Sequence, residues 1–98
     1  MKNFVSEKIG GGKLLQVEVE THDGIAQSVR ITGDFFLHPE DAVCDLENAL
    51  VGACWGDTDD FLTTKLEEIV LSKNAQLVGF ACTDLVRLFK KAVVGETK

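Results

Sequence analysis

The sequence predicts an α+β fold in which a small, mostly antiparallel sheet packs against about three helices. Two segments of alternating polarity, residues 13–21 and 25–32, flank an Asp-Gly pair, the strongest short-range sign of a β-hairpin. Later segments, beginning near residues 39, 57 and 83, repeat apolar side chains at the spacing of amphipathic helices. The sheet is expected to comprise an N-terminal meander and one later short strand. The 98 residues are expected to form a single domain, residues 1–98.

The meander begins with a short edge strand at residues 4–9, which the glycine run at residues 10–12 ends. The next strand, residues 13–21, turns at His22-Asp23-Gly24 into a third strand, residues 25–32. A slip of one residue would turn every inner side chain to the outside, so the alternation defines the register. The side chains expected to face the core are Leu15, Val17, Val19, Ile25, Val29 and Ile31.

The first helix is expected to start at Pro39, because proline suits a first helical position. Glu40 and Asp41 would then lie in the first turn, where the helix dipole favours negative charge. Gly52 suits the left-handed position just past the helix end. The expected core stripe comprises Ala42, Val43, Leu46, Ala49 and Leu50.

Two consecutive phenylalanines leave the sheet where the third strand ends at Gly33-Asp34. Adjacent side chains of an extended chain point to opposite faces, so Phe35 and Phe36 cannot both enter the core in a regular strand. Two arrangements stay open. Either one ring faces outward or toward a partner, or both pack beneath the following helix through irregular backbone. His38 is expected to cap that helix or to lie on the surface.

The second helix is expected to be capped by Asp57, with Asp60 in its first turn, and to end near Lys73, before Asn74. Residues 76–80 suggest a short apolar strand, and Thr83 would cap the last helix. Residues 95–98 are expected to be a frayed tail. The expected core residues are Phe61, Leu62, Leu66, Ile69 and Val70 in the second helix and Leu85, Val86, Leu88, Phe89, Ala92 and Val93 in the third.

The net charge of −6 is concentrated in the middle of the chain, where residues 34–60 contain eight acidic residues and no lysine or arginine. This distribution argues against a nucleic-acid partner, because phosphates require a basic face. It is compatible with a basic protein partner, although a solvated face that keeps a small protein soluble is the favoured interpretation. No run of about 18 apolar residues predicts a membrane span, and no secretory signal is present. We therefore expect a cytoplasmic location.

No motif of catalysis or ligand binding is complete. Lys13 follows a glycine run but precedes a strand, whereas a phosphate-binding loop precedes a helix. Cys44, Cys54 and Cys82 are an odd number without close pairing, which predicts neither disulfides nor a zinc site but buried thiols. The aspartates near residue 57 lack the calcium-loop pattern. We expect no catalytic residue, cofactor or metal in this chain; a free-standing small-molecule enzyme is the remaining alternative of that kind.

Several stretches resemble one family. They are GDFF at residues 33–36, the Pro-Glu helix start at residue 39, LENALVG at residues 46–52, GGK at residues 11–13, and LVGF with a following Asp-Leu at residues 77–85. Together they resemble the C-terminal accessory domain of lipoate-protein ligases. The match is closest to the small separate accessory subunit found where the ligase is split into two chains, and it covers nearly the whole sequence.

The resemblance implies a non-catalytic subunit that docks on the catalytic subunit of a lipoate-protein ligase, which uses ATP, Mg and lipoate to form lipoyl-AMP. It implies only an indirect link to the lipoyl carrier domain. The residues that match the pattern, and that we expect at the partner interface, are Lys13, Gly33, Asp34, Phe35, Phe36 and Pro39. Phe35 or Phe36 is the expected anchor, since aromatic side chains dominate interface energies. Asp34 either caps the exit turn or pairs with a basic partner group.

A second, weaker resemblance is to U-type iron–sulfur assembly scaffolds or sulfur acceptors, from the final strand that leads to Cys82 before a helix. Those proteins require cysteines that converge on a cluster. Here Gly33-Asp34 occupies the position after the second ribbon strand, without a cysteine.

Overall fold

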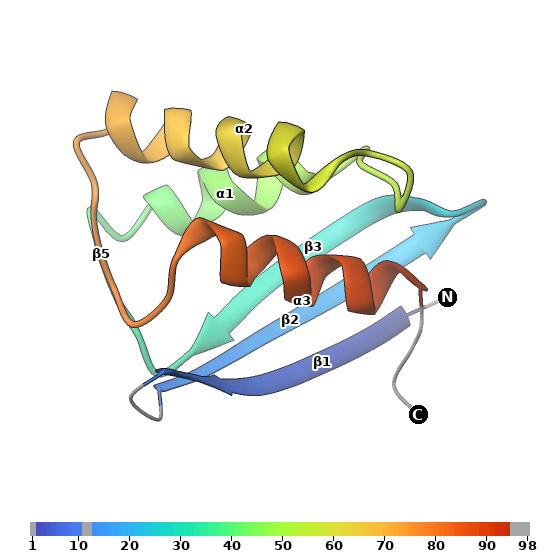
Figure 1. Ribbon diagram of the computed structural model, residues 1–98, viewed down its shortest axis with the longest axis horizontal. Helices are drawn as coiled ribbons and strands as arrows, with labels where there is room; N and C mark the ends of the chain where they lie inside the picture. The colour runs from blue at the N-terminus through green and yellow to red at the C-terminus, as the bar shows by residue number, and fades with distance from the viewer. Residues whose placement is uncertain (1, 11–12, 95–98) are drawn as a thin grey trace.

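The computed structural model describes residues 2–10 and 13–94 and confirms the α+β class (Figure 1). The predicted tail at residues 95–98 and two glycines of the run, Gly11 and Gly12, lie outside the described residues. The elements in chain order are β1 (Lys2–Ile9), β2 (Lys13–His22), β3 (Ile25–Gly33), β4 (Phe36–His38), α1 (Ala42–Leu50), α2 (Asp59–Ser72), β5 (Gln76–Val78) and α3 (Cys82–Val94).

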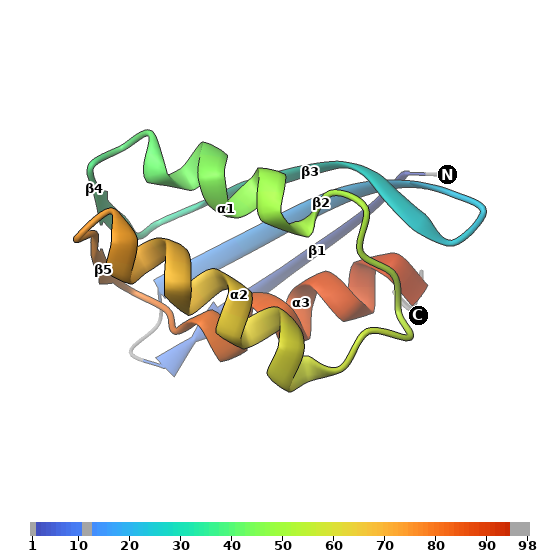
Figure 2. The same ribbon diagram turned by 90° about the horizontal axis from the view of Figure 1, so that it is seen from above.

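The predicted meander is present as a three-stranded antiparallel sheet in the order β1-β2-β3. All three helices lie on one face of this sheet (Figures 1 and 2). α1 packs on β3, α3 packs on β1 and β2, and α2 contacts both other helices. Among the described elements, none covers the opposite face of the sheet (Figure 1). None of the described helices is long and apolar enough to cross a membrane.

The core forms between the sheet and the helices, where the sequence patterns predicted it. The inner side chains of β2 and all six predicted core residues of α3 are buried. The largest fully buried side chains are Leu15, Val17, Val19, Leu46, Leu50, Leu62, Leu66, Leu85, Val86, Leu88 and Phe89.

A β-bulge in β3 near the hairpin changes which side chains of this strand point to the core. Glu20 pairs with Ser28 and Thr21 with Ala26, so Gln27 is an extra residue on β3. On the hairpin side of the bulge the side chains alternate in the opposite sense from that expected. Ala26 is 1% exposed and points to the core, whereas Ile25 is 42% exposed. The expectation that Ile25 faces the core is therefore wrong. The predicted hairpin turn is present, with the positive φ angles of 54° at Asp23 and 78° at Gly24.

The later short strand was expected to belong to the same sheet as the meander, but it does not. β5 pairs with β4 in a separate two-stranded sheet. The free side of β3 is already occupied: Ala26 N donates to Ala53 O at 3.0 Å, and Gly52 N donates to Ala26 O at 2.8 Å. Farther along, Ile31 N donates to the Glu47 carboxylate at 2.7 Å. These contacts leave no room for a fourth strand on that edge.

α1 begins later than the proline predicted. The helix starts at Ala42 with Asp41 at the N-cap, while Pro39, after a cis peptide bond, lies in the preceding turn. The acidic residue in the first turn is Asp45 instead of Glu40 or Asp41, and no side chain caps this end, so His38 is not a cap. The helix end is as expected, with Gly52 at a φ of 91° after the C-cap.

Different residues from those expected begin the other helices. The hydroxyl of Thr58 accepts the α2 cap bond from Phe61 N at 3.1 Å, whereas the Asp57 carboxylate accepts from Cys54 N. The Phe61 side chain is 55% exposed and lies outside the core stripe, contrary to expectation. Asn74 ends the helix, with a φ of 51°.

In α3 the helix already begins at Cys82, so Thr83 lies within its first turn and is not its cap. The Asp84 carboxylate accepts from Ala81 N at 2.9 Å at this end instead. This bond is half of a capping box, in which an acidic side chain binds the N–H at the start of its own helix.

Candidate functional site

Five of the six residues expected at a partner interface form one continuous path from β3 to α1. Gly33 ends β3, Asp34 and Phe35 follow, Phe36 begins β4, and Pro39 follows its last residue. The sixth residue, Lys13, begins β2. A hydrogen bond of 2.8 Å from Asp34 N to the carbonyl oxygen of Leu14 ties the path to this end of β2. The fold therefore places all six at one end of the molecule.

Gly33 has a structural reason to be glycine. Its φ is 144°, and an added Cβ would lie 2.2 Å from the carbonyl oxygen of Leu14. A second glycine, Gly79, has a φ of 121°, and its Cβ would lie 2.8 Å from the Cβ of Phe35. Both glycines therefore permit main chain to approach closely, so that the β3 exit lies against β2 and the end of β5 lies against Phe35.

The two phenylalanine rings take the first of the two arrangements that the sequence left open. Phe35 is half-buried and meets Phe80 edge to face, with ring centroids 5.0 Å apart and planes at 87°. Phe36 is 53% exposed, and the next residue, Leu37, is buried. Side chains alternate through this short strand, so one ring joins the core and the other is presented outward.

An apolar surface surrounds the outward ring. Phe36 lies opposite Val78, which is also 53% exposed, in the β4–β5 pairing. Its ring stacks against that of exposed His38, with centroids 6.4 Å apart and planes 11° apart. We name Phe36, His38 and Val78 the ribbon patch. A hollow beside it is lined by Phe35, Phe36, Leu37, His38, Glu40 and Val43. Sequence reasoning missed Val78, because nothing local shows that β5 pairs with β4.

The charges near the ribbon patch are negative. Asp34 and Glu40 are exposed, and Glu40 lines the hollow. In the described part of the chain, neither forms an ion pair with a lysine or arginine. Elsewhere in the acidic segment, Asp45 pairs with Lys73 at 3.0 Å, and the Glu47 carboxylate accepts a main-chain N–H. Asp34 and Glu40 therefore leave two exposed carboxylates near the exposed aromatic ring.

The three cysteines do not gather. Cys44 is exposed and Cys54 is half-buried, so the expectation of buried thiols holds only for Cys82. Burial, together with the nearby Glu67 carboxylate, raises the pKa of the Cys82 thiol. Within residues 2–10 and 13–94, no three His, Cys, Asp or Glu side chains are placed to hold a metal ion. The iron–sulfur alternative required convergent cysteines, and the described residues do not supply them.

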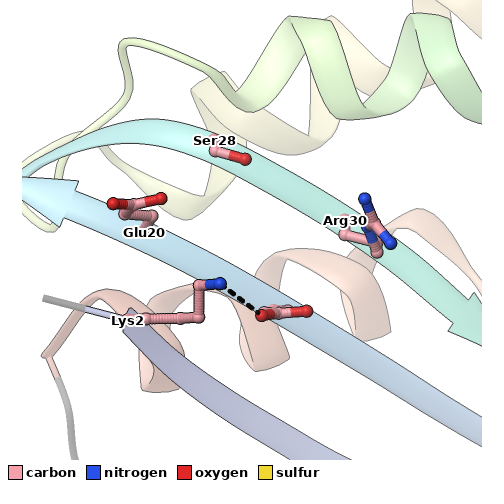
Figure 3. A pocket seen from close by; sticks show the side chains of 5 residues that line it. Lys2, Glu20, Ser28 and Arg30 are labelled. Carbon is pink, nitrogen blue, oxygen red and sulfur yellow. Dashed lines mark ion pairs between the residues drawn. The ribbon is translucent and has the colours of Figure 1, made fainter.

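Two other hollows differ in chemistry. On the uncovered sheet face, Lys2, Glu18, Glu20, Ser28 and Arg30 line a polar hollow, in which Lys2 pairs with Glu18 at 3.4 Å (Figure 3). Its lining carries both signs of charge, so it favours no ligand of one charge. Beside the C-terminal end of α2, Glu67, Val70, Leu71, Leu77 and Cys82 line an open, mainly apolar groove.

No protein-family model and no curated protein matches this chain. Among solved structures, it is similar to a chain from the structural analysis of an archaeal lipoylation system, described as a bi-partite lipoate protein ligase and its E2 lipoyl domain from Thermoplasma acidophilum. The TM-score is 0.66 at 20% sequence identity, and the match covers 90% of this chain and 96% of that chain. The two chains therefore share one fold over nearly their whole lengths.

Proposed function

We propose that this chain is the non-catalytic accessory subunit of a split lipoate-protein ligase. It docks on the catalytic subunit and enables ATP-dependent formation of lipoyl-AMP, the step before the lipoyl group passes to a carrier protein. The observation that supports this proposal is the end-to-end likeness in fold to a chain from a two-part ligase system, with 90% and 96% of the two chains covered. The GDFF and LENALVG stretches, which resemble the accessory subunit, support the proposal from the sequence.

A subunit without catalytic side chains can still raise a rate. If it binds the closed, ordered form of the catalytic subunit more tightly than the open form, it shifts the population toward the competent state. ATP, Mg and lipoate would all bind the partner. Closure around the reactive acyl-adenylate would also exclude water, which otherwise hydrolyses it.

The ribbon patch is the docking surface that best fits this role. Its exposed pair, Phe36 and Val78, is an apolar contact that a partner can cover. The nearby carboxylates of Asp34 and Glu40 favour lysine or arginine at the rim of the partner surface. The complementary surface is therefore an apolar pocket with basic residues around it.

The experiment measures lipoyl-AMP formed from ATP and lipoate by the purified catalytic subunit, with and without an equimolar amount of this chain. We expect adenylate only when both chains are present. The chain after thermal denaturation is the control for nonspecific protein effects. Equal lipoyl-AMP formation by the catalytic subunit alone would refute the proposal.

A further inference from the structure

The two edges of the three-stranded sheet differ sharply. The edge of β3 is covered by main-chain bonds to residues 52–53 and by the Glu47 carboxylate. β1 pairs with β2 over all eight of its residues without a bulge, and in the described part of the chain no strand or loop pairs with its other side. The contact from Asn3 Nδ2 to Ala92 O uses a side chain and leaves the β1 main chain untouched. β1 is thus a regular strand with an open edge, which offers main-chain donors and acceptors to another strand.

Cations stand on both sides of this edge, although the chain as a whole carries −6. Lys2 and Lys8 are exposed on the face of β1 away from the helices. On the helix side, Arg87 and Lys91 of α3 both contact Glu7 of β1, with Lys91 Nζ 3.2 Å from the carboxylate. Arg87 also pairs with Asp84 at 3.3 Å, and Lys2 pairs with Glu18 of β2 at 3.4 Å. Four cations against three carboxylates leave a net positive charge at this edge, and α3 runs beside β1 (Figure 2).

We propose that the open edge of β1 is a second docking site, where an extended acidic segment of the catalytic subunit adds a strand to the sheet. This inference rests on the proposed function. Main-chain hydrogen bonds would hold the added strand, and its alternating side chains would supply the selectivity. Acidic side chains on its helix side would meet Arg87 and Lys91, and those on its other side would meet Lys2 and Lys8.

A second copy of this chain fits the same edge poorly. In a symmetric antiparallel pair centred on Val5, Lys2 of one copy would lie opposite Lys8 of the other. Each edge also carries more cations than carboxylates, so two copies would bring together surfaces of like net charge. Like charges directly opposite each other destabilise strand pairing, so the edge favours an acidic strand over its own copy.

Amide hydrogen exchange, followed by NMR, tests the inference with the intact chain and the purified catalytic subunit. The alternate β1 amides that point away from β2 should exchange freely when the chain is alone, because no described strand pairs with them. In the complex we expect them to exchange at least about tenfold more slowly, as paired strand amides do. Complex formation is measured separately by calorimetry. Absence of any complex would refute the proposed function itself. A complex with unchanged β1 exchange would overturn only the strand-addition inference.

A matched pair of variants tests the charge argument. Lys8→Gln removes an exposed cation at the open edge, whereas Arg30→Gln removes an exposed cation from β3, on the same face but two strands away. We expect Lys8→Gln to weaken binding to the catalytic subunit about fivefold and to reduce its salt dependence, as for one partly exposed ion pair. Arg30→Gln should leave both unchanged. Equal affinities of the two variants would contradict the inference.

Discussion

Replacement of Phe36 by alanine tests the ribbon patch most sharply. The Phe36 ring is 53% exposed, so a docked partner can cover about half of its surface. For a phenylalanine side chain of roughly 200 Å², this is about 100 Å² of apolar area. At about 25 cal/mol per Å², the lost burial is about 2.5 kcal/mol, which corresponds to a Kd about 70-fold weaker. Fold stability should change little, since loss of one cross-strand pair costs about 0.2–1 kcal/mol.

The assay is isothermal titration calorimetry of each variant with the catalytic subunit. Phe61→Ala is the matched control, because its ring is 55% exposed but lies on α2, where Lys65 Nζ stands 5.7 Å from the ring centroid. We expect Phe61→Ala to bind with the wild-type Kd. A wild-type Kd for Phe36→Ala, or an equal loss in both variants, would refute the reasoning.

Three further predictions concern stability and thiol chemistry. Gly33→Ala should lower the free energy of unfolding in urea by more than about 3 kcal/mol, because the positive φ and a clash with a β2 carbonyl act together. A loss below about 1 kcal/mol would contradict this. The hydrogen bond from Arg87 lowers the pKa of Glu7 below 4.5, so its contribution to stability is complete above pH 4.5 and is lost as pH falls through the lowered pKa. Urea unfolding of Glu7→Gln should therefore depend less steeply on pH below 4.5 than wild type does; identical slopes would count against the pairing. Iodoacetamide at pH 8 should alkylate exposed Cys44 before Cys82, whose buried thiol has a raised pKa, and the reverse order by mass spectrometry would be inconsistent with the fold.

Much of the fold followed from periodicity. The alternation in β2 and the helical spacing in α3 predicted the buried side chains correctly, because each of these elements packs one continuous face against the core. The predictions were wrong where contacts between distant parts of the chain determine the local structure. The bulge at Gln27 turned Ile25 outward, and the β4–β5 pairing depends on segments far apart in the chain. No local pattern contains either fact.

The candidate site was predictable only in part. Strand alternation left open whether one phenylalanine ring or both would enter the core, and the structure places Phe35 half-buried and Phe36 outward. The need for glycine at position 33 depends on its contact with the Leu14 carbonyl of β2, which the sequence does not show. Val78 entered the patch through pairing alone. The local sequence determines which side chains a strand carries, whereas the tertiary fold determines which of them come together on one surface.

The proposed function requires that this chain activates a larger enzyme without a catalytic group of its own. The most direct measurement is the initial rate of lipoyl-AMP formation by a fixed amount of catalytic subunit as this chain is titrated in. We expect a rate that rises from near background and saturates at one accessory chain per catalytic subunit, with no ATP turnover by this chain alone. A flat titration, or ATP turnover by the isolated chain, would contradict it.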